Sequence, residues 1–179
     1  MDNGASSYRR YLDGDDNGIV EIIRDYKDGL ILFINRYVNN LCIAEELCED
    51  TFFKLVSRKP HFSEKYSFKT WLYTIGRNTA LNYLKRENTA ELTDDVSARL
   101  SLEREYLRTE QRIAVNRAIK LLNPDYSQVL YLSFFEELKN DEIAHIMKKN
   151  KRQVENLIYR AKLALRSELN KEGFIYEEL

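Results

Sequence analysis

Apolar side chains recur three or four residues apart along most of the chain, the spacing that places them on one face of a helix. The clearest stripe consists of Ile19, Ile22, Ile23, Tyr26, Leu30, Ile31, Ile34, Tyr37, Val38 and Leu41. Further helices are predicted over residues 43–55 and 68–85, and Lys59–Pro60 separates them because proline cannot continue a helix. Every regular element that this pattern predicts is α-helical.

A polar stretch over residues 87–101 lacks the periodicity and divides the pattern into two parts. In the second part, Asn123–Pro124 has the form of a helix cap followed by proline at the first helical position, opening a helix that ends near residue 135. The sequence therefore predicts an all-α protein with two small helical domains. They cover residues 8–87 and 112–172, and a flexible linker over residues 88–111 joins them.

Residues 141–160 have the pattern of two helices joined by a tight turn, a helix-turn-helix. Ile143 and Met147 share one face of the first helix, and the small side chain of Ala144 allows the second helix to come close. The second helix supplies an apolar face made of Val154, Leu157 and Ile158. The hydrophobic spacing alone thus predicts two helices that pack against each other.

The turn itself combines unusual and favourable residues. Lys148 stands where glycine would most easily take a left-handed conformation, and Lys149 where an apolar residue is usual. Asn150 can cap the second helix, and Gln153 follows three residues later, where its side chain can complete a capping box. The first helix of the motif follows Lys139, and we expect Asn140 to cap it.

The outward side chains of the second helix are basic or polar. They are Lys151, Arg152, Gln153, Glu155, Asn156, Tyr159 and Arg160. They lie near the start of the helix, where a recognition helix presents hydrogen-bonding groups to base edges and charge to phosphates in duplex DNA. The alternative interpretation is structural, because any helical hairpin in a bundle also has a solvated, charged face.

Charge along the chain is segregated, although the formal net charge is only −1. Residues 57–88 carry seven Lys/Arg against two Asp/Glu, and residues 139–171 carry nine against four, so each segment has a net charge of +5. Acidic residues concentrate in residues 42–50 and 87–111, each with a net charge of −4. This distribution predicts two nucleic-acid contacts and an acidic patch for a different partner.

Composition argues against several other classes of protein. Cys42 and Cys48 are the only cysteines, and their spacing fits no zinc pair, so we expect two buried free thiols and no metal site. His61 and His145 are isolated and no glycine-rich phosphate loop occurs, which predicts no enzyme and no cofactor. No apolar run approaches the roughly 20 residues of a membrane span, and no signal-peptide pattern begins the chain, so we expect a cytoplasmic protein without membrane insertion.

Residues 66–86 combine aromatic side chains with cations and amides, the groups that bind single-stranded nucleic acid. Bases released from a duplex stack on aromatic rings, while Lys and Arg follow the phosphates and Asn contacts a base edge. Phe68 and Trp71 are interpreted as core residues. The candidates for contact with a melted strand are the polar residues Lys69, Arg77, Asn78, Asn82, Lys85 and Arg86.

Three blocks, in order, resemble the extracytoplasmic-function sigma factors of bacterial RNA polymerase. Residues 43–55 are similar to the region 2 helix that docks on the polymerase clamp, and residues 68–84 to the helix that opens and reads the minus-ten element. Leu122–Asn123–Pro124, followed by the helix-turn-helix, resembles region 4, which binds the minus-thirty-five element as duplex. The resemblance covers most of the chain.

The resemblance implies a transcription initiation factor with region 2 in the first domain and region 4 in the second. Its implied partners are promoter DNA and core RNA polymerase, through the clamp of the β′ subunit and the flap of the β subunit, with an anti-sigma factor as a further partner. The implied polymerase-docking residues are Glu45, Glu46, Glu49 and Asp50. His61, in the loop over residues 57–66, is implied to contact the melted strand.

Two other functions fit part of the pattern. A conventional helix-turn-helix regulator with an N-terminal ligand-binding or dimerisation domain needs only the C-terminal motif, but it leaves the helix over residues 68–85 unexplained. A purely structural helical adaptor requires both basic segments to be coincidental. Copurification with core polymerase distinguishes the sigma factor from both.

Overall fold

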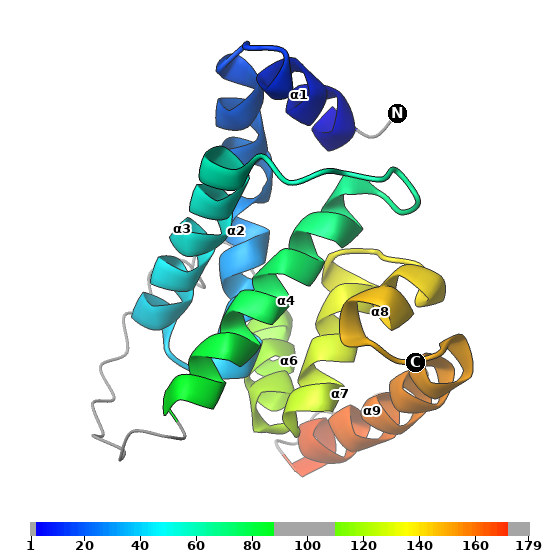
Figure 1. Cartoon of the computed structure of the whole chain (residues 1–179). Coiled ribbons are helices and arrows are strands. Elements are labelled where there is room, and N and C mark those ends of the chain that lie inside the picture. Colours follow the sequence, from blue (N-terminus) through cyan, green and yellow to red (C-terminus); the bar gives the residue numbers. More distant parts are fainter. Residues whose placement is uncertain (1–2, 88–109, 172–179) are drawn as a thin grey trace. The chain divides into compact units, whose positions relative to one another are not determined.

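The computed structural model describes residues 3–87 and 110–171 of the 179, and every regular element in these two ranges is helical. The chain divides into two compact units (Figure 1). Most of the predicted linker, residues 88–109, lies outside the described residues. None of the helices in the two described ranges is long and apolar enough to span a membrane.

The first unit consists of four helices: α1 (Asn3–Leu12), α2 (Asn17–Val38), α3 (Leu41–Arg58) and α4 (Phe68–Glu87). Helix α2 contacts each of the other three (Figure 1). The predicted stripe is confirmed from its start to the middle of the helix, where Ile19, Ile22, Leu30, Ile31 and Ile34 are buried. Helix α4 packs closely on α2 because Gly76 has no side chain: a Cβ atom there would lie 2.7 Å from Cδ1 of Leu30.

The ends of α2 and α3 are set by local chemistry. Asn39 takes a left-handed conformation at the end of α2, with φ of 50°, and the Asn40 side chain then caps α3 by accepting a hydrogen bond from Ile43 N at 3.3 Å. Helix α3 ends at Arg58, immediately before the Lys59–Pro60 pair that was predicted to stop it.

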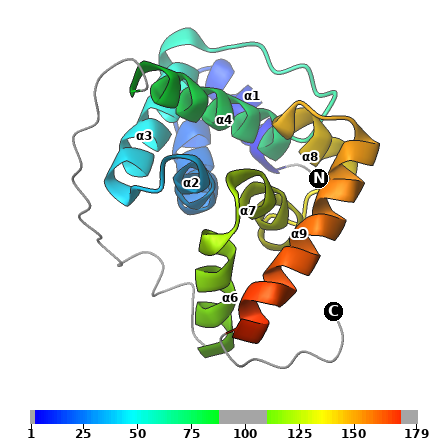
Figure 2. The same ribbon diagram turned by 90° about the horizontal axis from the view of Figure 1, so that it is seen from below.

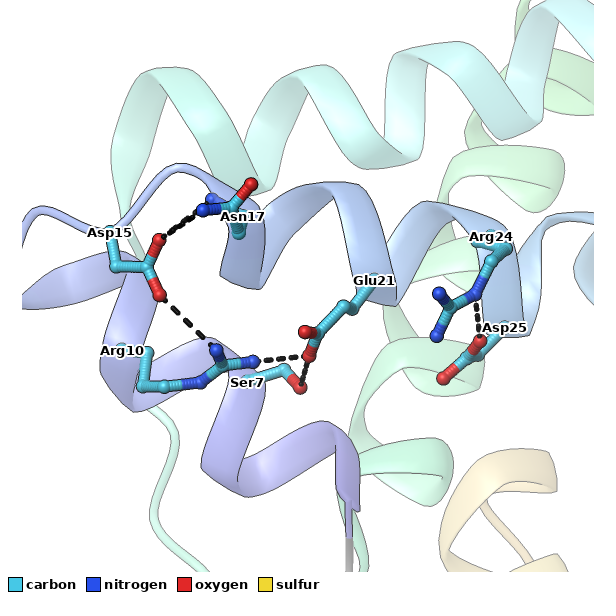
Figure 3. A network of polar contacts seen from close by, with 7 residues as sticks. All are labelled: Ser7, Arg10, Asp15, Asn17, Glu21, Arg24 and Asp25. Atoms are coloured by element: carbon cyan, nitrogen blue, oxygen red, sulfur yellow. Dashed lines mark hydrogen bonds and ion pairs between the residues drawn. The ribbon is translucent and has the colours of Figure 1, made fainter.

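Helix α1 was not among the predicted helices, and it is fixed to α2 by polar contacts (Figure 3). The guanidinium of Arg10 forms ion pairs with Glu21 and Asp15, and Ser7 Oγ donates a hydrogen bond to the same Glu21 carboxylate at 2.7 Å. The hydrogen bond from Arg10 lowers the pKa of Glu21, so this carboxylate stays ionised. Close packing is possible because Gly18 of α2 faces the backbone of Ser7.

The two cysteines differ in environment. Cys48 is buried, with its thiol 3.7 Å from the carbonyl oxygen of Lys27 on α2, and burial raises the pKa of this thiol to about 12. Cys42 is exposed, so the prediction of two buried thiols is wrong for this residue. The reason is geometric: six residues turn a helix by about 240°, so the two side chains leave α3 in different directions.

The second unit contains α6 (Glu110–Leu121), α7 (Pro124–Leu130), the π-helical turn η1 (Tyr131–Phe135), most of α8 (Asn140–Met147) and α9 (Lys151–Lys171). Helices α6, α7 and α9 pack together, with Ala118 and Leu169 in a shared core (Figure 2). The predicted cap at Asn123–Pro124 is confirmed, since the Asn123 side chain accepts a hydrogen bond from Tyr126 N at 2.9 Å.

Candidate nucleic-acid interface

The turn between α8 and α9 is closed by backbone hydrogen bonding. Lys148 has a φ of 53°, in the left-handed region, and Lys149 N donates to the carbonyl oxygen of Ala144 at 2.9 Å. This is the pattern in which glycine usually follows the last residue of a helix, and here a lysine accepts the strained conformation. The amine of Lys149 forms an ion pair with Asp125 of α7 at 2.9 Å, which explains a lysine at a half-buried position.

The first helix of the motif begins differently from the prediction. Asn140 is the first residue of α8 and not its cap. The preceding residue, Lys139, has the cap position, and its backbone N–H donates to the Glu142 carboxylate at 3.2 Å. A glutamate reaching back from the third helical residue satisfies one of the free N–H groups at the helix start, so no capping side chain is needed at Asn140.

The capping box predicted for α9 is confirmed in both directions. Asn150 Oδ1 accepts a hydrogen bond from Gln153 N at 2.8 Å, and Gln153 Oε1 accepts one from Asn150 N at 2.8 Å. The amide oxygen of Gln153 is therefore engaged inside the protein. This bond uses one of the two lone pairs of the amide oxygen and fixes the orientation of the side chain, while the NH2 group of Gln153 stays available to DNA.

All seven candidate duplex-binding residues of α9 are exposed, and Val154 between them is fully buried. The exposed residues Arg152, Glu155 and Asn156 lie within one turn, with Tyr159 one turn further on. Lys151 is partly engaged, because its amine lies 3.5 Å from the Asp141 carboxylate. We call the exposed positions 151–153, 155–156 and 159–160 the α9 surface. It has hydrogen-bonding groups of both kinds and a net positive charge.

Helix α4 brings some of the candidate single-strand residues together. Asn78, Asn82 and Lys85 follow one another at intervals of four and three residues, so they lie on one side of the helix. Trp71 lies in line with them two turns earlier, and Arg86 borders the row. We call these five residues the α4 stripe. Its polar members are half-buried or exposed.

Two predicted residues do not lie on this stripe. The nine residues between Lys69 and Asn78 turn the helix by about 180°, so Lys69 leaves α4 on the opposite side, and Arg77 lies about 100° from Asn78. Phe68 is buried as predicted, whereas Trp71 is only half-buried. The Trp71 ring packs on Tyr8 and Phe68 with centroids 5.2 and 5.4 Å apart, so it belongs to both the edge of the core and the surface.

The loop over residues 59–67 connects α3 to α4 (Figure 1). Phe62 anchors it, with its ring 5.6 Å from that of Phe68 and 5.3 Å from that of Trp71. The neighbouring His61 is exposed. His61 thus directly precedes the residue whose ring packs against Trp71, at the aromatic end of the α4 stripe.

Helix α3 presents acidic side chains beside an exposed aromatic ring. Glu46, Glu49 and Asp50 are exposed and Glu45 is half-buried. Phe53, three residues after Asp50 and four after Glu49, is 67% exposed. We call these five residues the α3 surface. Sequence reasoning missed Phe53, although the signal was present: of two adjacent phenylalanines on a helix only one can face the core, and the structure buries Phe52.

A polar contact joins α3 to α4 beneath these surfaces. The amine of Lys54 donates to Thr79 Oγ1 at 2.7 Å, and Thr51 Oγ1, which is buried, donates to the same oxygen at 3.4 Å. Burial lowers the pKa of Lys54. Within residues 3–87 and 110–171, no group of His, Cys, Asp and Glu side chains is arranged to hold a metal ion.

Comparison with known proteins finds a matching family model for each of the two units. Residues 22–89 match the family model described as Sigma-70 region 2, and residues 112–165 match the model described as Sigma-70, region 4. Among curated proteins, RNA polymerase sigma factor YlaC of Bacillus subtilis is 28% identical over 163 residues, covering 87% of this chain and 94% of YlaC. The ECF RNA polymerase sigma factor BldN of Streptomyces coelicolor is 28% identical over 155 residues, covering 83% of this chain and 59% of BldN.

The fold agrees with this match. The sigma factor RpoE of Bartonella quintana, solved in complex with the anti-sigma factor NepR, superimposes with a TM-score of 0.67 at 18% identity, covering 84% of this chain and 95% of RpoE. The two matched models together span more than half of this chain, with region 2 before region 4. The chain therefore belongs to the sigma-70 family of RNA polymerase sigma factors, in its extracytoplasmic-function group.

Proposed function

We propose that this sigma factor binds core RNA polymerase and directs promoter-specific initiation by recognising and melting promoter DNA, without catalysing a reaction itself. The observation that carries the proposal is the pair of separate polar surfaces, on α9 and on α4, each within a unit matched by a different sigma-70 region. A conventional regulator would need only the first surface. The proposed site of action of this sigma factor is the cytoplasm, where polymerase and promoter meet.

The α9 surface binds the minus-thirty-five element as duplex. Its residues emerge from the first three turns of a capped helix, where a recognition helix enters the major groove. Arg152 and Arg160 supply positive charge for phosphates or guanine, and Asn156 supplies an amide for a base edge. Exposed Glu155 suits a cytosine amino group and opposes phosphate contact at the same point.

The α4 stripe, with His61 of the loop, binds the melted minus-ten strand. Asn78 and Asn82 offer amides to unpaired bases, Lys85 offers charge to the phosphates, and Trp71 has one part of its ring available for stacking. Lys69 and Arg77 lie off the stripe, and in this proposal they act on the DNA backbone.

The α3 surface docks on the clamp of the polymerase β′ subunit, and the region 4 unit contacts the flap of the β subunit. An exposed aromatic ring surrounded by charged groups is a typical anchor of a protein interface. The match to RpoE, a sigma factor solved with an anti-sigma factor, supports an anti-sigma factor as a further partner of this chain.

Transcription with core polymerase tests the proposal directly. The protein should stimulate initiation from its cognate promoter, which selection from a random promoter library would provide, and free protein should bind that duplex weakly. Tight, sequence-specific duplex binding by the protein alone, without stimulation of core polymerase, would establish the conventional regulator instead.

The two DNA-reading surfaces can be separated by variants. Arg152→Ala should weaken binding of holoenzyme to duplex promoter. The slope of the logarithm of the binding constant against the logarithm of the salt concentration should become less negative by about 0.9 for each phosphate that the protein no longer neutralises. Asn78→Ala should leave duplex binding intact and slow promoter opening. The rate of opening is measured by permanganate reactivity. Arg166→Ala, an exposed arginine further along α9, is the matched control. Normal opening by Asn78→Ala, with loss of binding to a premelted template in Arg152→Ala, would contradict the assignment.

Docking can be tested by reversing charge at two positions. Glu49→Lys with Asp50→Lys should weaken assembly with core polymerase, because attraction is replaced by like-charge repulsion. Asp13→Lys with Asp16→Lys makes the same change in net charge at exposed positions near the start of α2 and should not weaken assembly. Phe53→Ala should weaken assembly by about tenfold or more at little cost in stability, since the ring is exposed. Equal recovery of polymerase by both double variants would contradict the docking site.

A further inference from the structure

Helix α1 lies before the residues matched by the region 2 model, which begin at residue 22. Its side chains nevertheless reach across the fold to the loop over residues 59–67. Tyr8 Oη donates a hydrogen bond to the carbonyl oxygen of Pro60 at 2.8 Å, and the Arg9 guanidinium donates two to one carboxylate oxygen of Glu64, at 2.6 and 3.0 Å. One contact is made at the start of the loop and the other near its end.

The contacts coincide with the points where the loop backbone is strained. Lys59 and Glu64 have φ values of 40° and 54°, in the left-handed region that lysine and glutamate rarely adopt. The Lys59 amine lies 4.8 Å from the centre of the Tyr11 ring of α1, and Glu64 is held by Arg9. Both residues are therefore contacted by α1. The conformation of Lys59 is also that of the cap that ends α3, where its backbone N–H donates to Leu55 O at 3.1 Å, so the strain that α1 compensates within the loop is that of Glu64.

The aromatic packing supports the same arrangement. The ring of Tyr8 is almost fully buried, with its centroid 5.6 Å from Phe68 and 5.2 Å from Trp71, so its hydroxyl is held in a fixed place beside Pro60. Burial raises the pKa of Tyr8 to about 12, so the hydroxyl remains a hydrogen-bond donor across the physiological range. The anchor is rigid, and the loop segment that it holds carries the exposed His61.

We propose that α1 is a positioning element for promoter reading, in which Tyr8 and Arg9 hold the loop over residues 59–67 in the conformation that presents His61 to the melted strand. This inference rests on the proposed role of the loop in binding the minus-ten strand. Neither residue touches DNA in this arrangement. Their effect on DNA is exerted through the loop, so loosening α1 should weaken binding of the melted strand and leave duplex binding by α9 unchanged.

Trypsin cleavage after Lys65 measures the loop conformation without DNA. Lys65 is the only lysine or arginine within residues 60–67, and trypsin does not cleave the Lys59–Pro60 bond. Cleavage needs an open loop, so its rate follows the open population when closing is fast. Tyr8→Phe keeps the ring and removes one hydrogen bond, which should accelerate cleavage about fivefold. Arg9→Gln breaks an exposed ion pair and should accelerate it up to about fivefold.

Arg24→Gln is the matched control. Arg24 is an exposed arginine of α2, and its ion pair goes to the neighbouring Asp25 and not to α1 or the loop (Figure 3). This variant should leave cleavage after Lys65 close to that of the unaltered protein. The double variant Arg9→Glu with Glu64→Arg restores the pair in reverse. A lysine-specific protease, which ignores the new arginine, should cleave it after Lys65 more slowly than it cleaves Arg9→Glu alone, a rescue that a general loss of stability would not give.

Binding of holoenzyme to a premelted promoter template then tests the effect on DNA. Tyr8→Phe and Arg9→Gln should weaken it by factors similar to those for cleavage, and His61→Ala should also weaken it. Unchanged cleavage in both α1 variants, or equal acceleration by Arg24→Gln, would overturn the positioning role. Faster cleavage with unchanged binding, while His61→Ala weakens binding, would overturn the link from loop to DNA. If His61→Ala also binds normally, the proposed role of the loop is wrong, and this inference falls with it.

Discussion

The capping box of α9 gives a prediction whose size follows from two hydrogen bonds. Replacing Asn150 by Ala removes the acceptor of the Gln153 N–H, now 2.8 Å away, and leaves one backbone donor at the start of α9 without a protein partner. At an exposed helix start this costs about 1 kcal/mol. Gln153→Ala removes the opposite bond and should cost about 0.5 kcal/mol, because water can reach the freed N–H of Asn150.

The two effects should not add. Each side chain helps to hold the partner that it bonds, so the double variant should be destabilised by less than the sum of the single variants. Asn150→Asp keeps the acceptor oxygen and places negative charge at the helix start, and it should restore stability to that of the unaltered protein or slightly above. A destabilisation of about 1 kcal/mol corresponds to a decrease of roughly 4–8 °C in the melting temperature of a unit of this size.

Amide hydrogen exchange over the first two turns of α9 is the appropriate measurement, because unfolding of the whole chain also reports the other unit. Asn150→Ala should accelerate exchange there about fivefold and leave α2 unchanged. Exchange at the unaltered rate in Asn150→Ala would refute the reasoning, as would failure of Asn150→Asp to restore protection. Either result would mean that tertiary packing alone, through buried Val154, fixes the start of α9.

Three further outcomes follow from the core of the first unit. A thiol reagent should label Cys42 rapidly and Cys48 only as fast as the fold opens, and two fast thiols would contradict the burial of Cys48. The raised pKa of Cys48 stabilises the fold fully below about pH 9, and this contribution is lost as pH rises toward 12. Denaturation between pH 9 and 10.5 should therefore show a stability loss of up to about 1.4 kcal/mol per pH unit from Cys48, which Cys48→Ala removes; the buried Tyr8 adds to the loss at the upper end, and a slope unchanged by Cys48→Ala would contradict the prediction. Gly76→Ala should destabilise the protein by about 1–3 kcal/mol because its methyl group meets Leu30 at 2.7 Å, and Leu30→Val should recover part of the loss; an unaffected melting temperature would contradict the close packing.

Features determined by neighbouring residues could be predicted from the sequence. The α2 stripe, the cap at Asn123 and the reciprocal pair Asn150–Gln153 depend on spacings of three or four residues, which the helix geometry converts directly into contacts. The left-handed conformation of Lys148 belongs to the same class, because Lys148 directly follows the last residue of α8, the position at which helices commonly end in this conformation.

Features that depend on distant contacts could not be predicted. The bonds from Tyr8 to Pro60 and from Arg9 to Glu64 join residues more than 50 positions apart, and no local pattern encodes them. Candidate residues were also grouped by type and not by angle around the helix, so Lys69 was placed with Asn78 although α4 carries it to the other side. The roles of the site residues in binding DNA and polymerase stay predictions.

The exposed ring of Phe53 also has a consequence for how the free protein behaves in concentrated solution. An uncovered phenyl group invites two copies to associate through it, and the carboxylates of Glu46, Glu49 and Asp50 surround it with like charge that opposes such pairing. The same side chains that are proposed to select a partner thus also oppose self-association, by electrostatic repulsion, while no partner is bound. Screening these carboxylates with molar salt removes the repulsion and leaves the ring open to self-association.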